Sequence, residues 1–180
     1  MNNKGVTLIE LLVSMSIGSI LIIITLSLVI SGLKLSERIN DDIEVQQHGV
    51  FSTTYMLKKI THAQNVYSLK GRNGIRDIDS KEQVELGTIV LKTNESDFSG
   101  YTFNIKSNPY TKNYSLKYGE SLYEMGSIEI GNFIESIKVN SLPYYSSYSN
   151  AKGLEFIFKI KKDNASVILR KKAYFKNFKK

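Results

Sequence analysis

The segment Lys4-Gly5-Val6-Thr7-Leu8-Ile9-Glu10 leads directly into twenty uncharged residues, Leu11 to Ile30. Fourteen of these twenty are Leu, Ile, Val or Met. As a helix they would extend about 30 Å, at about 1.5 Å per residue, which matches the hydrocarbon core of a bilayer. The sequence therefore predicts one membrane-spanning helix near the N-terminus.

Glu10 is a carboxylate at the beginning of this apolar run. A charged side chain at the centre of a membrane helix disfavours insertion by about 2.5 to 3.5 kcal/mol, whereas each Leu, Ile, Val or Phe favours it by roughly 0.3 to 0.6 kcal/mol. The apolar residues outweigh Glu10, which also lies near the helix end, where water and headgroups reduce the penalty. Insertion is therefore expected, but it does not explain the carboxylate.

The charges that flank the run predict its orientation. Lys4 and the terminal amine precede it, whereas acidic residues dominate after it. The flanking residues on that side are Lys34, Glu37, Arg38, Asp41, Asp42 and Glu44. Because basic residues favour the cytoplasmic side, we expect a single-pass protein with its N-terminus in the cytoplasm and residues from about Gly32 outside.

A secretory signal peptide is one alternative, since Ser31-Gly32 could serve for cleavage. Its apolar region would be about 7 to 15 residues, shorter than the run observed, and it would not contain a carboxylate. A plain signal anchor explains the length of the run but not Glu10.

The stretch from Gly5 to Val13 resembles the N-terminal signature of type IV prepilins and type II secretion pseudopilins. The resemblance implies that prepilin peptidase cuts between Gly5 and Val6, so that residues 1–5 form the leader. It also implies that Val6 becomes the methylated N-terminus. Val6 departs from the commoner phenylalanine at this position.

The same resemblance gives Glu10 a role in subunit assembly, because it becomes the fifth residue of the mature chain. In a helical filament its carboxylate can meet the terminal amine of a neighbour. Such a pair at about 4 Å gains about 4 kcal/mol at an effective dielectric of about 20, set against the desolvation of both ions. We expect the pair to fix register along the filament. The alternative is that Glu10 reaches the cytoplasmic interface of a monomeric anchor.

Beyond the span, apolar residues recur at intervals of three, four or seven. They are Leu35, Ile39, Ile43, Val50, Leu57 and Ile60. This periodicity predicts a helix from about Val6 to Ala63 whose second half lies with these residues against a domain. We expect a transmembrane and assembly helix over 6–32 and an extracytoplasmic domain over 33–180, with amphipathic helix to about 65.

From Val66 onward the apolar pattern changes to a period of two, which is typical of strands with one buried face. The expected strands are 86–92, 101–106, 114–117, 127–130, 133–139, 154–160 and 167–175. Asp163-Asn164 suits a tight turn before the last strand. The predicted class is α+β, a long helix packed on an antiparallel sheet, as in the type IV pilin fold that the resemblance implies.

The order of these elements resembles PilW-like minor pilins and the minor pseudopilin J of type II secretion. The resemblance implies a structural subunit at the tip or initiation complex of a type IV pilus. Its implied partners are other pilin subunits, prepilin peptidase and the inner-membrane assembly platform. The chain has no cysteine, so the exposed domain is expected to hold without a disulfide.

The chain has a net charge of +7, and basic residues gather near its C-terminus. They are Arg170, Lys171, Lys172, Lys176, Lys179 and Lys180, beside aromatic residues. Such a cluster suits contact with an anionic partner: DNA, as in competence pseudopili, anionic wall polymers, or acidic sister subunits. The plainer interpretation is a closing strand with a solvated basic tail.

Nothing in the sequence favours catalysis, a metal or a cofactor. The two histidines, His48 and His62, both fall on the predicted helix, and no zinc, phosphate-loop or nucleophile motif is present. Asp77 and Asp79 do not follow an EF-hand pattern, and residues 71–74 indicate a simple turn. A monomeric, signal-anchored surface-binding domain remains the alternative to a pilin subunit.

The loop from Ser141 to Gly153 is rich in Tyr and Ser, and we expect Tyr144, Tyr145 and Tyr148 to be exposed there. This composition is typical of an adaptable contact surface, but an ordinary strand connection is the favoured interpretation.

Overall fold

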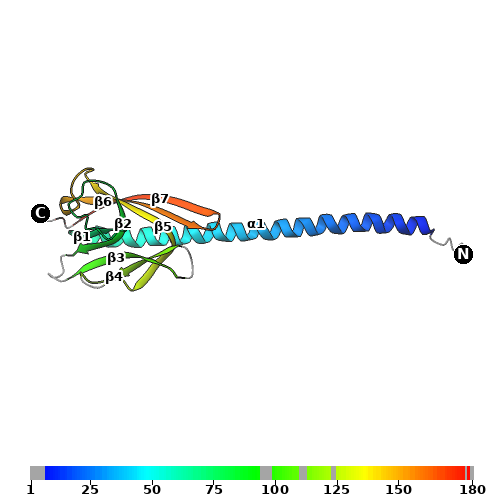
Figure 1. Cartoon of the computed structure of the whole chain (residues 1–180), viewed down its shortest axis with the longest axis horizontal. Coiled ribbons are helices and arrows are strands. Elements are labelled where there is room, and N and C mark those ends of the chain that lie inside the picture. The colour runs from blue at the N-terminus through cyan, green and yellow to red at the C-terminus, as the bar shows by residue number, and fades with distance from the viewer. Residues whose placement is uncertain (1–6, 94–98, 110–112, 123–124, 177, 179–180) are drawn as a thin grey trace. The chain divides into compact units, whose positions relative to one another are not determined.

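A computed structural model describes residues 7–93, 99–109, 113–122, 125–176 and 178 (Figure 1). One long helix, α1 (Leu8–His62), precedes seven strands. The strands are β1 (Asn65–Gly71), β2 (Val84–Lys92), β3 (Gly100–Ser107), β4 (Tyr114–Gly119), β5 (Ile128–Leu142), β6 (Gly153–Lys162) and β7 (Ala165–Tyr174). A 3₁₀ turn, η1 (Tyr148–Asn150), lies between β5 and β6. The chain divides into residues 1–40 and residues 41–180, which we describe separately.

The first unit is helical from Leu8 onward, and its apolar side chains are exposed. It contains the one helical stretch in the described residues that is long and apolar enough to cross a membrane, with a mean hydropathy of 2.5. Its hydroxyl groups turn back onto the helix: Ser14 Oγ donates to the carbonyl of Glu10 at 2.7 Å and Thr25 Oγ1 to that of Leu21 at 2.8 Å. These polar side chains are therefore satisfied without water.

In the second unit an antiparallel sheet packs against the last turns of α1, which confirms the predicted α+β class. The strands follow one another in chain order from β1 to β7, and β2 also pairs with β5 through Val84↔Val139 and Glu85↔Lys138. Figure 1 shows β6 and β7 on one side of this part of α1 and β3 and β4 on the other.

The face of α1 that enters the core is not the predicted one. Ile43 and Val50 are exposed, as are Leu35 and Ile39 in the first unit, and Leu57 is only partly buried. Of the predicted residues only Ile60 lies fully inside. The buried residues are Val45, Gly49, Ser52, Thr53, Met56 and Ile60.

This buried face contains small and polar residues because the sheet comes very close to it. A Cβ on Gly49 would lie 2.8 Å from Ile160 Cδ1 and 3.0 Å from Leu169 Cδ1. The hydroxyl of Thr53 donates to the carbonyl of Gly49 at 2.8 Å, so it is buried with its hydrogen bond made. Close packing and local hydrogen bonds therefore decide which face is buried.

Most predicted strands are confirmed. Leu154, Phe156, Phe158 and Ile160 on β6 are fully buried in the core, as their alternation predicts. The strands predicted at 127–130 and 133–139 are instead one strand, β5, which continues through Phe133 with a positive φ of 61°. Strand β1 was not predicted, because its burial pattern does not alternate strictly.

The predicted turn at Asp163-Asn164 is confirmed. Strand β6 ends at Lys162 and β7 begins at Ala165, and Asp163 has the positive φ of 48° that a two-residue turn requires. Residues 71–74 also form the predicted turn, in which Gly74 donates its backbone N–H to the carbonyl of Gly71 at 2.9 Å.

Candidate functional site

The N-terminal site predicted from the sequence lies partly outside the described residues, since the structure describes neither Gly5 nor Val6. The described part begins at Thr7. The carboxylate of Glu10 accepts the backbone N–H of Thr7 at 2.8 Å and its hydroxyl at 2.9 Å. In return, Thr7 Oγ1 lies 3.4 Å from the backbone N–H of Glu10.

This arrangement is a capping box, in which the side chains at the first and fourth positions of Thr7-Leu8-Ile9-Glu10 satisfy backbone donors at the beginning of α1. The Thr-x-x-Glu spacing before an apolar run is the sequence signal that indicates a capping box. Glu10 therefore has a local structural role within its own chain. Any role in assembly must be separated from this one by experiment.

The C-terminal basic residues do not form one cluster. Strand alternation and pairing with β6 place Arg170 and Lys172 on the outer face of β7, opposite Ile157 and Glu155. Lys171 lies on the other face of the strand, in register with the buried Phe156.

Beyond β7 the basic residues diverge further. Lys176 follows the strand, and its backbone N–H donates to the carbonyl of Thr61 at 3.1 Å. Lys179 and Lys180 lie outside the described residues. The predicted set is thus divided between at least two surfaces.

The outer face of β5, β6 and β7 instead brings other cations beside Arg170 and Lys172. We call this the basic face: Lys138, Lys159, Lys161, Arg170 and Lys172. Lys138 and Arg170 both lie in register with the half-buried Ile157, one on each neighbouring strand. Sequence reasoning missed Lys138, Lys159 and Lys161 because only strand register brings them together.

Carboxylates partly neutralise the basic face. Lys159 Nζ pairs with Glu135 Oε1 at 2.9 Å, and Lys172 Nζ lies 3.8 Å from Glu155 Oε1. Lys138, Lys161 and Arg170 form no ion pair with any residue that the structure describes.

Glu155 is a buried carboxylate within the basic face, with a side chain only 3% exposed. It accepts hydrogen bonds from Asn140 Nδ2 at 2.9 Å and Tyr144 Oη at 3.1 Å. Burial acts to raise the pKa of Glu155, but these hydrogen bonds and the charges of Arg170 and Lys172 outweigh burial and leave the pKa below its ordinary value. Glu155 is therefore charged at neutral pH.

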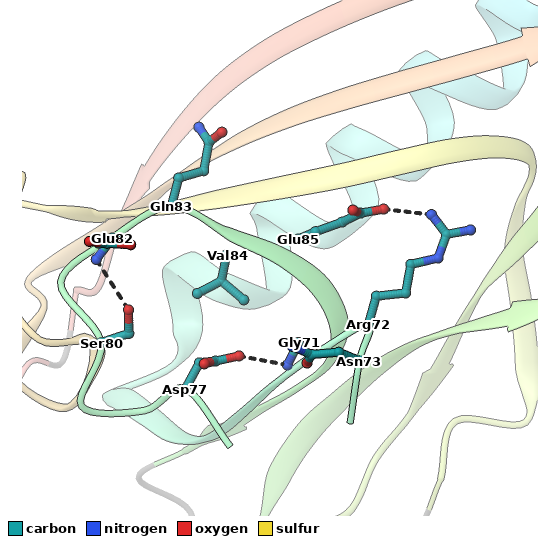
Figure 2. Close-up of a pocket in the computed structure, with 9 residues that line it drawn as sticks. All are labelled: Gly71, Arg72, Asn73, Asp77, Ser80, Glu82, Gln83, Val84 and Glu85. Carbon is teal, nitrogen blue, oxygen red and sulfur yellow. Dashed lines mark hydrogen bonds and ion pairs between the residues drawn. The ribbon is translucent and has the colours of Figure 1, made fainter. Parts of the chain in front are cut away.

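A cavity of about 270 Å³ lies beside the turn that follows β1 (Figure 2). Several of its polar groups have partners: Asp77 Oδ2 accepts the backbone N–H of Gly71 at 3.1 Å, and Arg72 pairs with Glu85. Arg72 also stacks on the ring of Tyr114, at 3.8 Å from its centroid. These interactions give the cavity a structural role in fixing the turn.

No group of three or more metal-ligating side chains is found among the described residues. Both histidines have local contacts instead. His48 packs edge-on against Phe133, with ring centroids 5.4 Å apart, and His62 Nδ1 lies 2.7 Å from the carbonyl of Lys58.

The tyrosine-rich loop differs from expectation at one residue. Tyr145 and Tyr144 are exposed, but Tyr148 is fully buried. The hydroxyl of Tyr148 lies 2.7 Å from the carbonyl of Val139 and 2.8 Å from that of Glu82, so this ring anchors the loop to the sheet.

Comparison with known proteins gives one match, to a short N-terminal motif. Residues 1–26 match the prokaryotic N-terminal methylation motif. No curated protein and no solved structure matches the chain. The motif supports a type IV prepilin-like protein that is structural rather than enzymatic, and together with the apolar helix it supports anchoring in a membrane.

Proposed function

We propose that this chain is a minor pilin, which prepilin peptidase cuts between Gly5 and Val6 and which is then incorporated into a type IV pilus. The observation that carries the proposal is the match of residues 1–26 to the N-terminal methylation motif, continued by an apolar helical stretch of membrane-spanning length. The α+β domain over residues 41–180 is the arrangement of the type IV pilin fold.

In this proposal the apolar helix has two successive environments. Before assembly it holds the subunit in the cytoplasmic membrane, with the C-terminal domain outside. During assembly its exposed apolar side chains pass from lipid to the helices of neighbouring pilin subunits. Glu10 is a carboxylate in this stretch and would pair with the methylated amine of a neighbour. The implied partners are other pilins, prepilin peptidase and the inner-membrane assembly platform.

We further propose a place at the tip or initiation complex rather than in the shaft. The order of elements along the chain supports this, because a long helix followed by short strands and a closing hairpin resembles PilW-like minor pilins and the minor pseudopilin J.

A second candidate function is contact with an anionic polymer such as DNA, as for a competence pseudopilus subunit. The observation that favours it is the basic face, where Lys138, Lys161 and Arg170 form no ion pair within the described residues. Cations spread over a sheet surface can follow a phosphate backbone without reading sequence. This function is compatible with a pilin subunit and with a monomeric anchored domain.

The decisive experiment is the intact mass and N-terminal sequence of the protein purified from the membrane of its own host. We expect a chain that begins at methylated Val6. The same host without prepilin peptidase should yield a chain that retains residues 1–5. If the leader remains in place while the peptidase is active on another substrate, the protein is a signal-anchored surface domain and the pilin proposal fails.

A further inference from the structure

A second pocket, of about 260 Å³, lies between the residues that precede β2 and the loop that follows β5. We call it the Tyr145 pocket; its lining residues are Lys81, Glu82, Gln83, Asn140, Ser141, Tyr144 and Tyr145. We propose that the Tyr145 pocket binds one sugar ring of an uncharged glycan. The proposal does not depend on how the N-terminus is processed.

Tyr145 is the first reason for this assignment. Its side chain is 82% exposed, and its backbone is left-handed, with a φ of 63°. A bulky residue adopts this conformation at a cost, whereas glycine would adopt it freely. The chain thus holds an aromatic ring in solvent at the expense of stability, which is characteristic of residues kept for binding.

The loop that carries Tyr145 is fixed by its own hydrogen bonds. Ser141 Oγ donates to the carbonyl of Ser146 at 2.6 Å, and Ser146 Oγ donates to the carbonyl of Pro143 at 2.7 Å. These bonds span the loop on both sides of Tyr145. A ligand therefore meets a loop that is already ordered, and little entropy is lost on binding.

The two walls of the pocket are also tied to each other. The buried hydroxyl of Tyr148 lies 2.8 Å from the carbonyl of Glu82, which lines one wall, and 2.7 Å from that of Val139, which directly precedes Asn140 of the other wall. Gln83 Nε2 donates to Asn140 Oδ1 at 3.2 Å, which joins the side chains across the pocket. Figure 2 shows the side chain of Gln83 pointing away from Asp77, which lines the cavity beside the turn that follows β1.

The chemistry of the lining favours an uncharged ligand with many hydroxyl groups. The charges of Lys81 and Glu82 cancel, and neither forms an ion pair with a described residue. Lys81 Nζ offers a donor and the Glu82 carboxylate an acceptor, and a ligand hydroxyl group can use both, whereas Asn140 and the hydroxyl of Tyr144 are already hydrogen-bonded within the chain. The π face of Tyr145 suits the positively polarised C–H groups on one side of a sugar ring.

The volume limits the ligand to about one ring. Clefts that bury drug-sized ligands measure roughly 300 to 1,000 Å³, and this pocket is smaller. A longer glycan would therefore contact the pocket through a single residue. A peptide, the other candidate, would meet one cation, Lys81, and one carboxylate, Glu82, but no deep apolar subsite for a side chain.

The test uses the full chain in dodecylphosphocholine micelles, because detergents with sugar headgroups would compete. The probes are trisaccharides of glucose, galactose and N-acetylglucosamine, with an uncharged peptide of similar mass as comparison. Saturation-transfer NMR identifies the bound sugar, and titration gives its Kd. We expect Tyr145→Ala to weaken binding about tenfold and Tyr145→Phe to preserve it.

Two further variants keep the result interpretable. Tyr67→Ala removes a half-exposed tyrosine on β1, outside the pocket, and should leave the Kd unchanged. Tyr145→Gly should weaken binding about as much as Tyr145→Ala while raising the melting temperature, because glycine relieves the left-handed backbone. Failure of all three sugars to bind, binding of the peptide alone, or an unchanged Kd in Tyr145→Gly would overturn the proposal.

Discussion

Gly131 on β5 lies directly against Ser52 of α1, so closely that a Cβ at residue 131 would overlap the hydroxyl oxygen of Ser52. That hydroxyl also lies 3.0 Å from the carbonyl of Ile130. At this point the side chain of Ser52 on α1 therefore contacts the backbone of β5, the longest strand. The contact is a hydrogen bond, not an apolar contact.

We expect Gly131→Ala to destabilise the domain by about 1 to 3 kcal/mol, the usual cost of overpacking a core. The added methyl group forces β5 away from α1 and breaks the hydrogen bond of Ser52. Chemical unfolding followed by circular dichroism measures the effect. Ser136→Ala, farther along β5 and only half-buried, should change stability by less than about 0.5 kcal/mol. Equal effects of the two substitutions would contradict the close approach.

Glu10→Gln separates the two roles of Glu10. Glutamine also completes a capping box, so the beginning of α1 and membrane insertion should be preserved. The charge is lost, and we expect incorporation into filaments to fall about tenfold or more, since part of the ion-pair energy survives desolvation. Immunoblotting of sheared filaments and membranes measures both quantities.

Thr7→Val is the matched control for Glu10, because it removes the hydroxyl of the capping box and keeps the carboxylate. We expect this variant to assemble at close to the wild-type level. If Glu10→Gln assembles normally and Thr7→Val does not, capping rather than charge is what assembly requires.

Because of Glu155, we expect the free energy of unfolding of the domain to depend on pH. The pKa of Glu155 is lower in the folded state, so its contribution is present above its unfolded pKa, about 4.3, and is lost as the pH falls through the folded value. We expect Glu155→Gln to cost about 1 to 3 kcal/mol at pH 7, because Asn140 and Tyr144 donate to different carboxylate oxygens and an amide replaces one of these acceptors with an NH₂ donor. The difference from wild type should shrink below about pH 4.

Unfolding curves of wild type and Glu155→Gln between pH 3 and pH 7 measure this difference. Asp79→Asn removes an exposed carboxylate and serves as the control, with little change expected at any pH. A Glu155→Gln penalty that stays constant down to pH 3 would show that the charge is not responsible.

The basic face predicts how the protein binds a polyanion. We expect the double variant Lys138→Gln/Arg170→Gln to weaken binding of a duplex DNA probe and to reduce the slope of log K against log salt by about two, one unit for each lost phosphate contact. Fluorescence anisotropy at several salt concentrations gives both values. Lys171→Gln/Lys176→Gln lowers the net charge equally but lies off this face, and should leave the slope nearly unchanged. Equal losses would indicate a general charge effect.

The sequence predicts an element correctly where a single effect, such as the burial of apolar side chains, decides its orientation. The alternation from Leu154 to Ile160 identified β6 because burial of apolar side chains decides the orientation of that strand. The same criterion failed on α1, where Gly49 and Thr53 are buried for reasons of size and local hydrogen bonding.

The candidate sites show the same division. The N-terminal motif is contiguous, so it can be recognised from the chain alone. The basic face cannot, because Lys138 and Arg170 become neighbours only through the register of β5, β6 and β7. Nor could the sequence indicate that Tyr148 is buried while Tyr145 is exposed, since a backbone turn separates them.

The chain-order arrangement of the sheet has a consequence for how the protein matures. Each strand pairs with the one before it, so in the proposed topology the sheet can grow hairpin by hairpin as the polypeptide leaves the membrane, and contacts between near neighbours in sequence form quickly. The contacts of Gly49 on α1 are among those that form late, because Ile160, Val167 and Leu169, which cover it, are synthesised late. The surface of α1 around Gly49 therefore stays exposed to solvent until the hairpin of β6 and β7 packs against it. The domain is complete only when this hairpin has packed.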